Sequence, residues 1–595
     1  MEKTFDSLSL DDRKIIIGID FGTTFTGVAW AETRRPDHIS VIESWPSHTG
    51  TQEGISSVKV PTELRYTSPK SANPDTKDEE KIEWGFQIPG LVDRYQWFKL
   101  GLDESNPLVS TKSWGDKTPD QLASDYLSAI HAHIMYSLEQ KLGAALLRTI
   151  PLEFSLTVPA IWTEAAKDKT LKAWKKASSY STTSPETKEP LVHLVSEPEA
   201  AAIYAIQGLD PHGLKVGDSF VLCDAGGGTV DLISYRIIEL SPILKVEEVT
   251  TGTGGPCGST FLNRRFADFL TRKLGREEGW DDEVLQEAVE RFDSIVKKQY
   301  SPTIDGGAGY VIPVPGMANN SSLNIRRGKI TISPSEMHFI FEPLILKVIK
   351  YVQDQIAACK NTSTTGTGKG IDIRAVLLVG GFGQNAYLKE RLRDALKSVE
   401  VLQPPNAWTA VVRGAVMMGL SRTKALKTVD VVSRKARKHY GIELHTPYRR
   451  DKGHDETKRY WCTRHGQYRV HAMFWFLERG ATLQEDKAIP IDFYQDFPVS
   501  KGRPGYVYTD VWANAENVDA PVHKNPGTKV LVTLKANLSA IPLVDLERTV
   551  VKRADGKEYY NIDAVIEATY SSAETKYVLN VMGKRYDVVN AEYAY

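Results

Sequence analysis

The chain has 595 residues, 41% hydrophobic and 25% charged, a composition typical of a globular protein that is too long for a single hydrophobic core. Its 74 basic and 75 acidic residues give a formal charge of -1, so the charge balance does not favour nucleic acid or an anionic membrane as a partner. No apolar run approaches the roughly 20 residues that a membrane-spanning helix needs.

The N-terminal segment and the cysteines bear on the cellular compartment. The segment MEKTFDSLSLDDRK is polar and acidic, unlike a secretory signal. The cysteines lie far apart, with neither a CxxC pair nor a metal-ligand spacing (Cys223, Cys257, Cys359 and Cys462). We therefore expect a reducing compartment, the cytoplasm or alternatively the nucleus.

The first third of the chain alternates predicted strands and helices. In chain order, the pattern predicts hairpin strands over 14–30 and 38–44, a long helix over 118–148, a buried strand at 154–160, a polar loop at 179–190, and a strand, turn and alanine-rich helix over 191–207. This alternation is typical of an α/β layered domain.

The following segment repeats the opening pattern, and the character changes after residue 428. In chain order, the sequence predicts a strand–turn–strand unit over 219–238, helices over 259–300, a loop rich in Gly, Pro and Asn at 301–325, a helix over 333–359, and a strand, diglycine turn and helix over 375–392. From there to the end, short alternating strands replace helical periodicity. We expect an α/β domain over 1–427 and a β-rich domain over 428–595.

Two strand–turn–strand units, 204 residues apart (224 minus 20), each contain Asp, then Gly, then Thr. Glycine lets backbone N–H groups approach anionic oxygens closely, and successive turn amides form an anion-binding concavity. The hydroxyls of Thr23, Thr24 and Thr229 can donate further hydrogen bonds. Either unit alone is readily explained as an ordinary hairpin turn, but two of them together with VGGFG (379–383) favour a phosphate site. The chain contains no GxxxxGK[ST] segment, which disfavours a P-loop fold.

The ordered motifs resemble a known family. IGIDFGTTFTGVAW, TVPA, VSEPEAAAIYA, VLCDAGGGTVDL and LLVGGFGQN occur in the order and approximate spacing of the 70-kilodalton heat-shock protein family. The resemblance spans nearly all of residues 15–425. It implies an α/β fold, a two-lobed actin-like (ribonuclease-H-like, duplicated) ATPase domain, followed by a β-rich, β-sandwich-like C-terminal domain.

The resemblance also implies the phosphate end of a nucleotide site. The first phosphate loop would comprise Gly22, Thr23, Thr24 and Phe25, and the second Gly226, Gly227, Gly228 and Thr229. Asp20 and Asp224 would hold a hydrated Mg²⁺ ion through water, with Asp231 supporting them. Glu197 resembles the carboxylate of the family's connecting segment, which orders the metal and its waters.

Lys99, in WFKLGLD, resembles the lysine that meets the γ-phosphate of ATP and positions the attacking water; an exposed lysine is the alternative interpretation. Catalysis would be in-line attack of water on the γ-phosphorus, giving ADP and phosphate. The residues assigned to it are Asp20, Lys99, Glu197, Asp224 and Thr229.

The purine end departs from the family pattern. The helix that contacts adenosine there resembles the stretch with Ser294, Lys297, Lys298 and Ser301 here, while a one-residue slip would place Asp293 instead of Ser294. The adenosine loop would comprise Gly380, Gly381, Phe382 and Gln384, with Phe382 either stacking on the base, which we favour, or packing in a core. Of the family's other glycine motif in this half, only Gly258 is retained.

The C-terminal part resembles the family's peptide-binding β-domain without its helical lid. HYGIE, MFWFLERGATL and VTLKANLSAIP occur in the family's order. The segment 429–444 takes the place of the interdomain linker and first strand, and its basic run 434–439 is either a solvated face or a docking patch. Residues 446–471 are expected to form an inserted charged loop.

The resemblance thus predicts an ATP-hydrolysing, chaperone-like protein that couples nucleotide state to protein or peptide binding. Its cofactors would be ATP or ADP and Mg²⁺, and its partners unfolded or specific client proteins, with co-chaperones or nucleotide-exchange factors, but neither nucleic acid nor membrane. Pro159 in TVPA resembles the family's switch proline. The alternatives are a nucleotide-gated scaffold with little turnover, a small-molecule (sugar) kinase of the same superfold, and a filament-forming actin relative.

Overall fold

The computed structural model describes residues 13–48, 55–67, 80–90, 92–104, 114–179, 191–209, 213–302, 309–362, 370–423, 426–485, 487–586 and 592–593. The N-terminal segment before residue 13 and nearly all of the expected polar loop at 179–190 lie outside these residues. The chain divides into two compact units, Met1–Asp430 and Val431–Tyr595. This division falls three residues after the boundary expected from the sequence.

The first unit contains two mixed sheets with the same local topology. The first sheet has the order β11-β10-β1-β2-β3, with β6 also pairing with β2. Its strands are β1 (Ile15–Phe21), β2 (Phe25–Glu32), β3 (Ser40–Val41), β6 (Val60–Pro61), β10 (Leu152–Val158) and β11 (Leu191–Ser196). β1 is antiparallel to β2 and parallel to β10, so the first sheet is built around a hairpin extended by parallel strands.

The second sheet repeats this arrangement with the order β19-β18-β12-β13-β14. Its strands are β12 (Ser219–Ala225), β13 (Val230–Glu239), β14 (Leu244–Gly255), β18 (Ile373–Val379) and β19 (Glu400–Leu402). β12 is antiparallel to β13 and parallel to β18, as β1 is to its own neighbours. Because the two hairpins occupy equivalent positions, each sheet presents one Asp–Gly–Thr turn at the end of its central strand.

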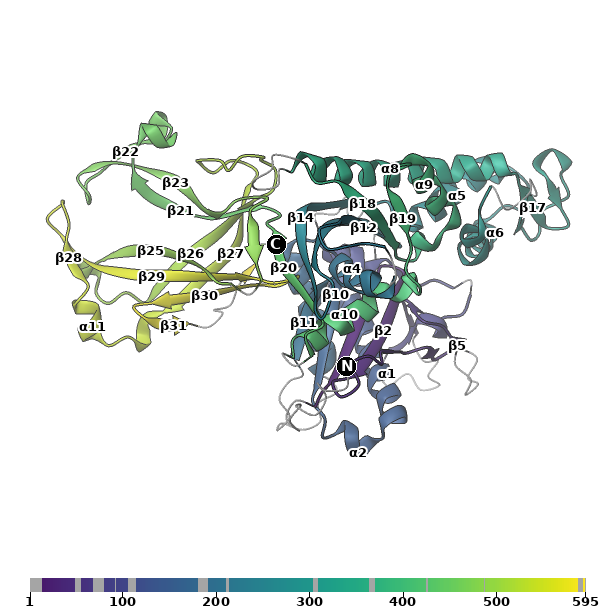
Figure 1. Cartoon of the computed structure of the whole chain (residues 1–595), viewed down its shortest axis with the longest axis horizontal. Helices are drawn as coiled ribbons and strands as arrows, with labels where there is room; N and C mark the ends of the chain where they lie inside the picture. The colour runs from purple at the N-terminus through teal and green to yellow at the C-terminus, as the bar shows by residue number, and fades with distance from the viewer. Residues whose placement is uncertain are drawn as a thin grey trace, which may run out of the picture. The chain divides into compact units, whose positions relative to one another are not determined.

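Helices cover the faces of both sheets (Figure 1). Those of the first sheet are α1 (Pro119–Leu142), α2 (Ala144–Leu147), α3 (Glu164–Ser179) and α10 (Ala410–Ser421), while α4 (Glu197–Gly208) packs against α10 and against β12, β13 and β18 of the second sheet. Those of the second sheet are α5 (Thr260–Leu274), α6 (Asp282–Arg291), the π-helical turn η6 (Phe292–Val296), α7 (Lys297–Gln299), α8 (Pro334–Asn361) and α9 (Ala386–Ala395). The helix α8 begins with a capping box in which Ser333 and Glu336 satisfy each other's backbone N–H groups.

Short strands complete the first unit. They are β4 (Ser44–Trp45), β5 (Ile55–Ser56), β7 (Glu63–Thr67), β8 (Lys81–Trp84), β9 (Tyr95–Gln96), β15 (Tyr310–Pro313), β16 (Ile325–Arg326) and β17 (Lys329–Ile332). Residues 310–313, expected in a loop, pair as β15 with β17. The apolar residues of this stretch reach the core that the second sheet shares with α5, α6 and α8, where Ile312 is fully buried.

The second unit consists of two antiparallel sheets. One has the order β22-β23-β21-β26-β27-β32 and the other β25-β29-β30-β31, with β28 also pairing with β29. Their strands are β21 (His439–Pro447), β22 (Tyr460–Cys462), β23 (Gln467–Leu477), β25 (Ile489–Pro498), β26 (Tyr506–Asn514), β27 (Thr528–Asn537), β28 (Val550–Lys552), β29 (Glu558–Tyr570), β30 (Thr575–Val581), β31 (Lys584–Tyr586) and β32 (Glu592–Tyr593). Both sheets contribute to one core that includes Ile442, Val511, Ile566 and Leu579, which makes the unit a β-sandwich.

One expectation for the C-terminal part is wrong in detail, and the basic run 434–439 begins in a strand. Arg434 and Lys435 belong to β20 (Val429–Lys435), which pairs with β24 (Thr482–Gln484). The expected charged loop at 446–471 contains β22 and the start of β23, which form a hairpin with the register Tyr460↔Arg469. The alternation of charged and aromatic residues there is the two-residue period of an edge hairpin.

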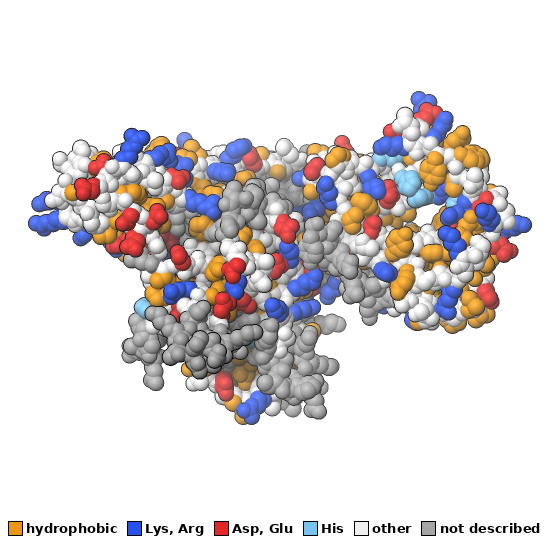
Figure 2. All heavy atoms as spheres, turned by 180° about the vertical axis from the view of Figure 1, so that it is seen from behind, with side chains coloured by type: hydrophobic (Ala, Val, Ile, Leu, Met, Phe, Trp, Pro, Cys, Tyr) orange, Lys and Arg blue, Asp and Glu red, His pale blue; other side chains and the backbone are white. Residues whose placement is uncertain are grey.

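Mixed α/β structure followed by a β-rich unit agrees with the fold class expected from the sequence. A short helix, α11 (Leu543–Glu547), precedes β28, and the described residues after it contain strands and turns but no helix. No helix in the described ranges has the length and apolar character needed to cross a membrane. On the face shown in Figure 2, Lys and Arg side chains are interspersed with Asp and Glu.

Candidate functional site

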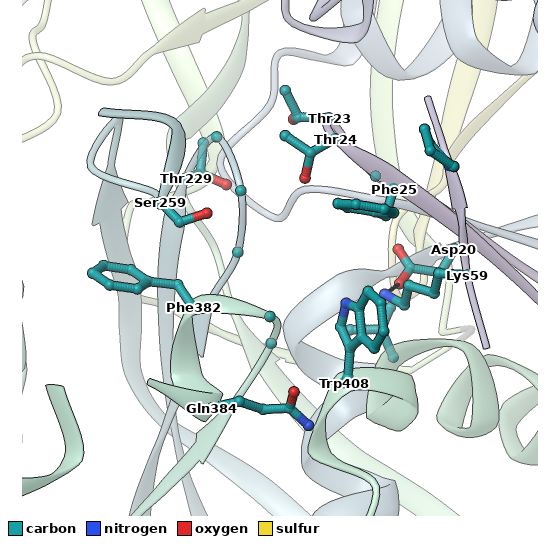
Figure 3. Close-up of a pocket in the computed structure, with 18 of the residues that line it drawn as sticks. Asp20, Thr23, Thr24, Phe25, Lys59, Thr229, Ser259, Phe382, Gln384 and Trp408 are labelled. Atoms are coloured by element: carbon teal, nitrogen blue, oxygen red, sulfur yellow. Dashed lines mark hydrogen bonds and ion pairs between the residues drawn. The ribbon is translucent and has the colours of Figure 1, made fainter. Parts of the chain in front are cut away.

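A cavity of about 710 Å³ in the first unit is lined by the turns of both hairpins (Figure 3). The first hairpin contributes Asp20, Gly22, Thr23, Thr24 and Phe25, and the second contributes Asp224, Gly226, Gly227, Gly228 and Thr229. The segments around α4, η6 and the diglycine turn after β18 also reach it. Residues separated by more than 200 positions in the chain thus meet around one hollow.

The two turns approach each other closely enough to require glycine. A Cβ atom on Gly228 would lie 2.8 Å from Oγ1 of Thr23, and one on Gly227 would overlap the side chain of Thr24. Within the turns, Gly22 N–H donates to the Asp20 carbonyl at 3.0 Å and Gly226 N–H donates to the Thr229 carbonyl at 3.0 Å. These bonds hold both turns in the compact form that directs backbone amides at an anion.

Gly258 supports the second turn and does not line the cavity. Its N–H donates to the Gly228 carbonyl at 3.1 Å, and a Cβ atom here would overlap the backbone of Gly227. The hydroxyl of Thr260 donates to the Gly227 carbonyl at 2.9 Å. The prediction that Gly258 contacts the ligand is therefore corrected to a structural role, while its neighbour Ser259 does line the cavity.

Two buried carboxylates, Asp20 and Asp224, border the cavity together with the partly buried carboxylate of Glu197. Asp231 stands opposite Asp224 in the β12–β13 pair and is 3% exposed, behind the cavity lining. Burial, partly offset by the Lys99 ammonium and reinforced by Asp20, raises the pKa of Glu197 to about 7. Burial and repulsion from Glu197 and Asp231 raise the pKa of Asp224 well above its usual range.

The donor set fits a hydrated Mg²⁺ ion better than a directly ligated one. Mg²⁺ prefers carboxylate oxygens and keeps several of its waters. Within the described ranges, no three His, Cys, Asp or Glu side chains are arranged to ligate a metal directly. Burial and the neighbouring carboxylates raise the pKa values of Glu197 and Asp224, so a hydrated cation beside them would favour their ionised forms.

Lys99 is buried at the cavity, which excludes the exposed alternative. It lies in the short helical turn η4 (Phe98–Leu102), and its side chain is 1% exposed. Its Nζ lies 2.6 Å from Oε1 of Glu197 and within 5.5 Å of the ring centres of Phe21 and Trp162. Since Glu197 begins α4, this ion pair joins that helix to the segment before α1.

A second buried lysine, Lys59, received no role from the sequence. Its Nζ lies 2.5 Å from Oδ2 of Asp20, and the two side chains are 8% and 6% exposed. Figure 3 shows the lysine directed at the carboxylate. The signal in the sequence was a single lysine inside the apolar stretch VKVP, where a charge is expected only if it is paired.

No family model matches this chain. Human Heat shock 70 kDa protein 12A is 23% identical over 500 residues, which cover 68% of this chain and 69% of that protein. Human Heat shock 70 kDa protein 12B is 23% identical over 501 residues, 68% of each chain. A ribosome-associated molecular chaperone of Zygosaccharomyces rouxii is 24% identical over 446 residues, 70% of this chain and 64% of that protein. The chain is related to the heat-shock protein 70 family.

Most of the residues expected to contact the purine also border the cavity. Asp293, Ser294, Lys297 and Lys298 all border it, so both alignments of the purine helix remain possible. The Lys297 ammonium is buried in an ion pair with Asp293 and donates to Asn263 at 3.1 Å. Ser301 is 1% exposed and does not border the cavity, which corrects its expected contact with the ligand.

The diglycine turn borders the cavity beside Asp224. Gly380 has a φ of +85°, which favours glycine, and a Cβ atom there would lie 2.6 Å from Oδ1 of Asp224. Gly381 and Gln384 also border the cavity.

The favoured stacking role of Phe382 is not supported. Although the residue borders the cavity, its side chain is 3% exposed and belongs to the hydrophobic core, and in Figure 3 its ring points away from the other labelled residues. Trp408 instead offers an aromatic ring to the cavity, on the side of the first turn, and it meets the ring of Phe25 edge-on with centroids 5.6 Å apart. Trp408 lies in the turn before α10, outside the glycine-rich motifs, so the sequence did not predict its place at the cavity.

Proposed function

We propose that this protein binds and hydrolyses ATP and couples its nucleotide state to the binding of client proteins, as a chaperone-like relative of the heat-shock protein 70 family. The first unit would be the two-lobed, actin-like ATPase domain, with one lobe built on each sheet. The observation that carries the proposal is the meeting of two Gly–Thr turns and the carboxylates of Asp20, Glu197 and Asp224 around a single cavity.

In this proposal the hairpin turns bind the phosphates of ATP. The backbone amides of residues 22–25 and 226–229, with the hydroxyls of Thr23, Thr24 and Thr229, would donate hydrogen bonds to phosphate oxygens. Asp20 and Asp224 would hold a hydrated Mg²⁺ through water, with Asp231 behind them. When bound, this ion would neutralise charge on the phosphates.

The ion pair of Lys99 and Glu197 would position the attacking water. The ammonium of Lys99 would donate to a γ-phosphate oxygen, and the carboxylate of Glu197 would accept a hydrogen bond from the water. Water then attacks the γ-phosphorus in line with the leaving ADP oxygen, and positioning and electrostatics supply the acceleration.

Client binding is assigned to the β-sandwich unit. The relatives of the chain include a ribosome-associated molecular chaperone. The unit also exposes large aromatic side chains, including Trp461, Phe474 and Tyr508, which are 55%, 48% and 59% exposed. Aromatic groups of this kind supply much of the contact energy at protein interfaces. Co-chaperones or nucleotide-exchange factors would complete the cycle.

The test is phosphate release by the purified full chain with Mg-ATP, with and without unfolded peptides. We expect turnover that peptides change, and at least about a tenfold loss of turnover in Asp224→Asn because the variant removes a carboxylate from the metal site. Asp372→Asn, an exposed aspartate just before β18, is the matched control and should turn over ATP like the wild type.

Other outcomes would contradict parts of the proposal. Unchanged turnover in Asp224→Asn would exclude its metal role. Phosphate transfer that requires a sugar or another acceptor would favour a kinase. Tight ATP binding without release would favour a nucleotide-gated scaffold.

A further inference from the structure

Asp20, Gly27 and Lys59 form a row across three neighbouring strands. Asp20 on β1 stands opposite Gly27 on β2. β2 pairs in turn with β6 through Thr26↔Val60, so Lys59 follows at the level of Gly27. The glycine between the two charged residues leaves the space above β2 open, and the side chain of Lys59 fills it.

The absence of a side chain at position 27 allows Lys59 to reach Asp20. A Cβ atom on Gly27 would lie 3.2 Å from Cγ and 3.3 Å from Cε of Lys59, so the aliphatic stem lies directly over the glycine. The backbone of Lys59 is held in place because the Ser57 hydroxyl donates to its carbonyl at 2.7 Å. The ammonium is thereby delivered to the carboxylate with little freedom to leave it.

This ammonium lies in the proposed phosphate site. Lys59 and Asp20 border the same cavity as Thr23, Thr24 and the glycines of the second turn. Among the described residues, the hydrogen-bond acceptor of the Lys59 ammonium is Asp20, at 2.5 Å. An ammonium has three N–H donors, so further donors remain for a phosphate oxygen.

We propose that Lys59 is a built-in cation of the phosphate site, which neutralises Asp20 and lets this chain bind the polyphosphate of a nucleotide with little dependence on a divalent metal. The inference rests on the nucleotide binding proposed above. A buried carboxylate facing phosphate would repel it, and a positive charge fixed at that carboxylate removes the repulsion. Lys99 does not supply this charge to Asp20, since its ammonium pairs with Glu197.

The experiment measures the affinity of the full chain for a fluorescent ATP analogue in Mg²⁺ and in excess EDTA. Replacing Mg²⁺ with EDTA should weaken the affinity of the wild type for the analogue by less than about fivefold. The same change of buffer should weaken the affinity of Lys59→Met by more than about tenfold, because the variant lacks the charge-assisted contact. In Mg²⁺ the variant should recover most of its affinity, since Asp20 is then free to hold the hydrated ion.

Three further variants separate charge from folding. Lys59→Arg keeps the charge and should stay within about threefold of the wild type in both buffers. Gly27→Ala keeps the lysine but places a methyl group in the path of its stem, so it should lose affinity in EDTA as Lys59→Met does. Lys14→Met is the control because it breaks another lysine–carboxylate pair, in which Lys14 Nζ lies 2.5 Å from Oε1 of Glu153. This pair does not border the cavity, so the variant should bind the analogue with wild-type affinity in both buffers.

The failures of the two proposals are distinguishable. Equal losses in EDTA for the wild type and Lys59→Met would overturn the role of Lys59 and leave nucleotide binding intact. Binding in neither buffer by a folded wild-type protein would overturn the proposed function and this inference with it. If Lys59→Met does not fold, the affinity of Lys59→Arg in EDTA decides the question, and a loss of more than about tenfold in this charge-retaining variant would contradict the proposal.

Discussion

Single residues in the first unit show how buried charge is stabilised in this fold. Lys59 and Lys99 each lie within hydrogen-bonding distance of a carboxylate, Asp20 and Glu197 respectively. An unpaired buried charge costs several kcal/mol, so removing either partner of such a pair should lower the free energy of unfolding. The two pairs also place both ammonium groups at the cavity that the hairpin turns line.

His131 provides a test of burial at the residue scale. It is 4% exposed and packs against Phe154 and Trp174, and this burial lowers its pKa to about 4. The unfolded chain, with a histidine pKa of about 6.5, binds a proton between these values that the folded chain does not. Stability should therefore fall as pH decreases from about 7 to about 4, by up to about 3 kcal/mol from this residue.

The measurement is the urea midpoint of unfolding across this pH range. His131→Phe should show a shallower decline than the wild type because it has no proton to bind. His38→Gln, which changes an exposed histidine, should follow the wild type. Parallel declines in the wild type and His131→Phe would contradict the assignment.

At the scale of elements, the close packing of α4 and α10 positions Glu197 at the cavity. A Cβ atom on Gly414 of α10 would overlap the Ala200 carbonyl of α4, and a Cβ atom on Gly18 of β1 would lie 2.7 Å from the Val412 carbonyl. Glycines thus bring helix, helix and strand backbones into direct contact.

Gly414→Ala should therefore push α4 away from α10 and destabilise the first unit by about 1–3 kcal/mol, the usual cost of overpacking. Thermal unfolding of the full chain measures the effect, with Gly90→Ala as the control because the nearest atom to its Cβ is 3.8 Å away. A melting temperature equal to that of the control would show that the helices can separate without cost.

Elements with strong periodicity were predictable from the sequence, and those with mixed signals were not. β1, β12 and α8 follow clear apolar patterns and lie where they were expected. The segment of β22 and β23 was predicted to be a loop because charged residues dominate it. An exposed edge hairpin can nevertheless form from charged residues when they alternate with a two-residue period and pair across the strands. β15 was missed because it is short and follows a glycine-rich segment.

At the scale of the whole molecule, the two units have separate hydrophobic cores. The core with Ile442 and Ile566 belongs entirely to the second unit, and the core around α8 entirely to the first. A unit with its own core can fold by itself.

A fragment of residues 427–595, which retains all of β20, should therefore give a β-type circular dichroism spectrum and a single cooperative urea transition. Ile566→Asp, which places a charge at a fully buried position, should abolish that transition. A broad transition of the unaltered fragment, with binding of a hydrophobic dye, would show that the second unit depends on the first.

The sequence by itself determined the two Gly–Thr turns of the candidate site and the α/β-then-β order of the chain. Asp20, the Gly–Thr turns and Asp224 form local motifs. Such motifs can be recognised in a sequence because backbone geometry restricts the residues that form these turns. Only the tertiary structure decided that Lys59 reaches Asp20, that Trp408 offers a ring to the cavity while that of Phe382 joins the core, and that Gly258 and Ser301 do not border the cavity. The physical reason is that these placements depend on which strands become neighbours, and a contact such as that of Lys59 over Gly27 leaves no periodic signal along the chain.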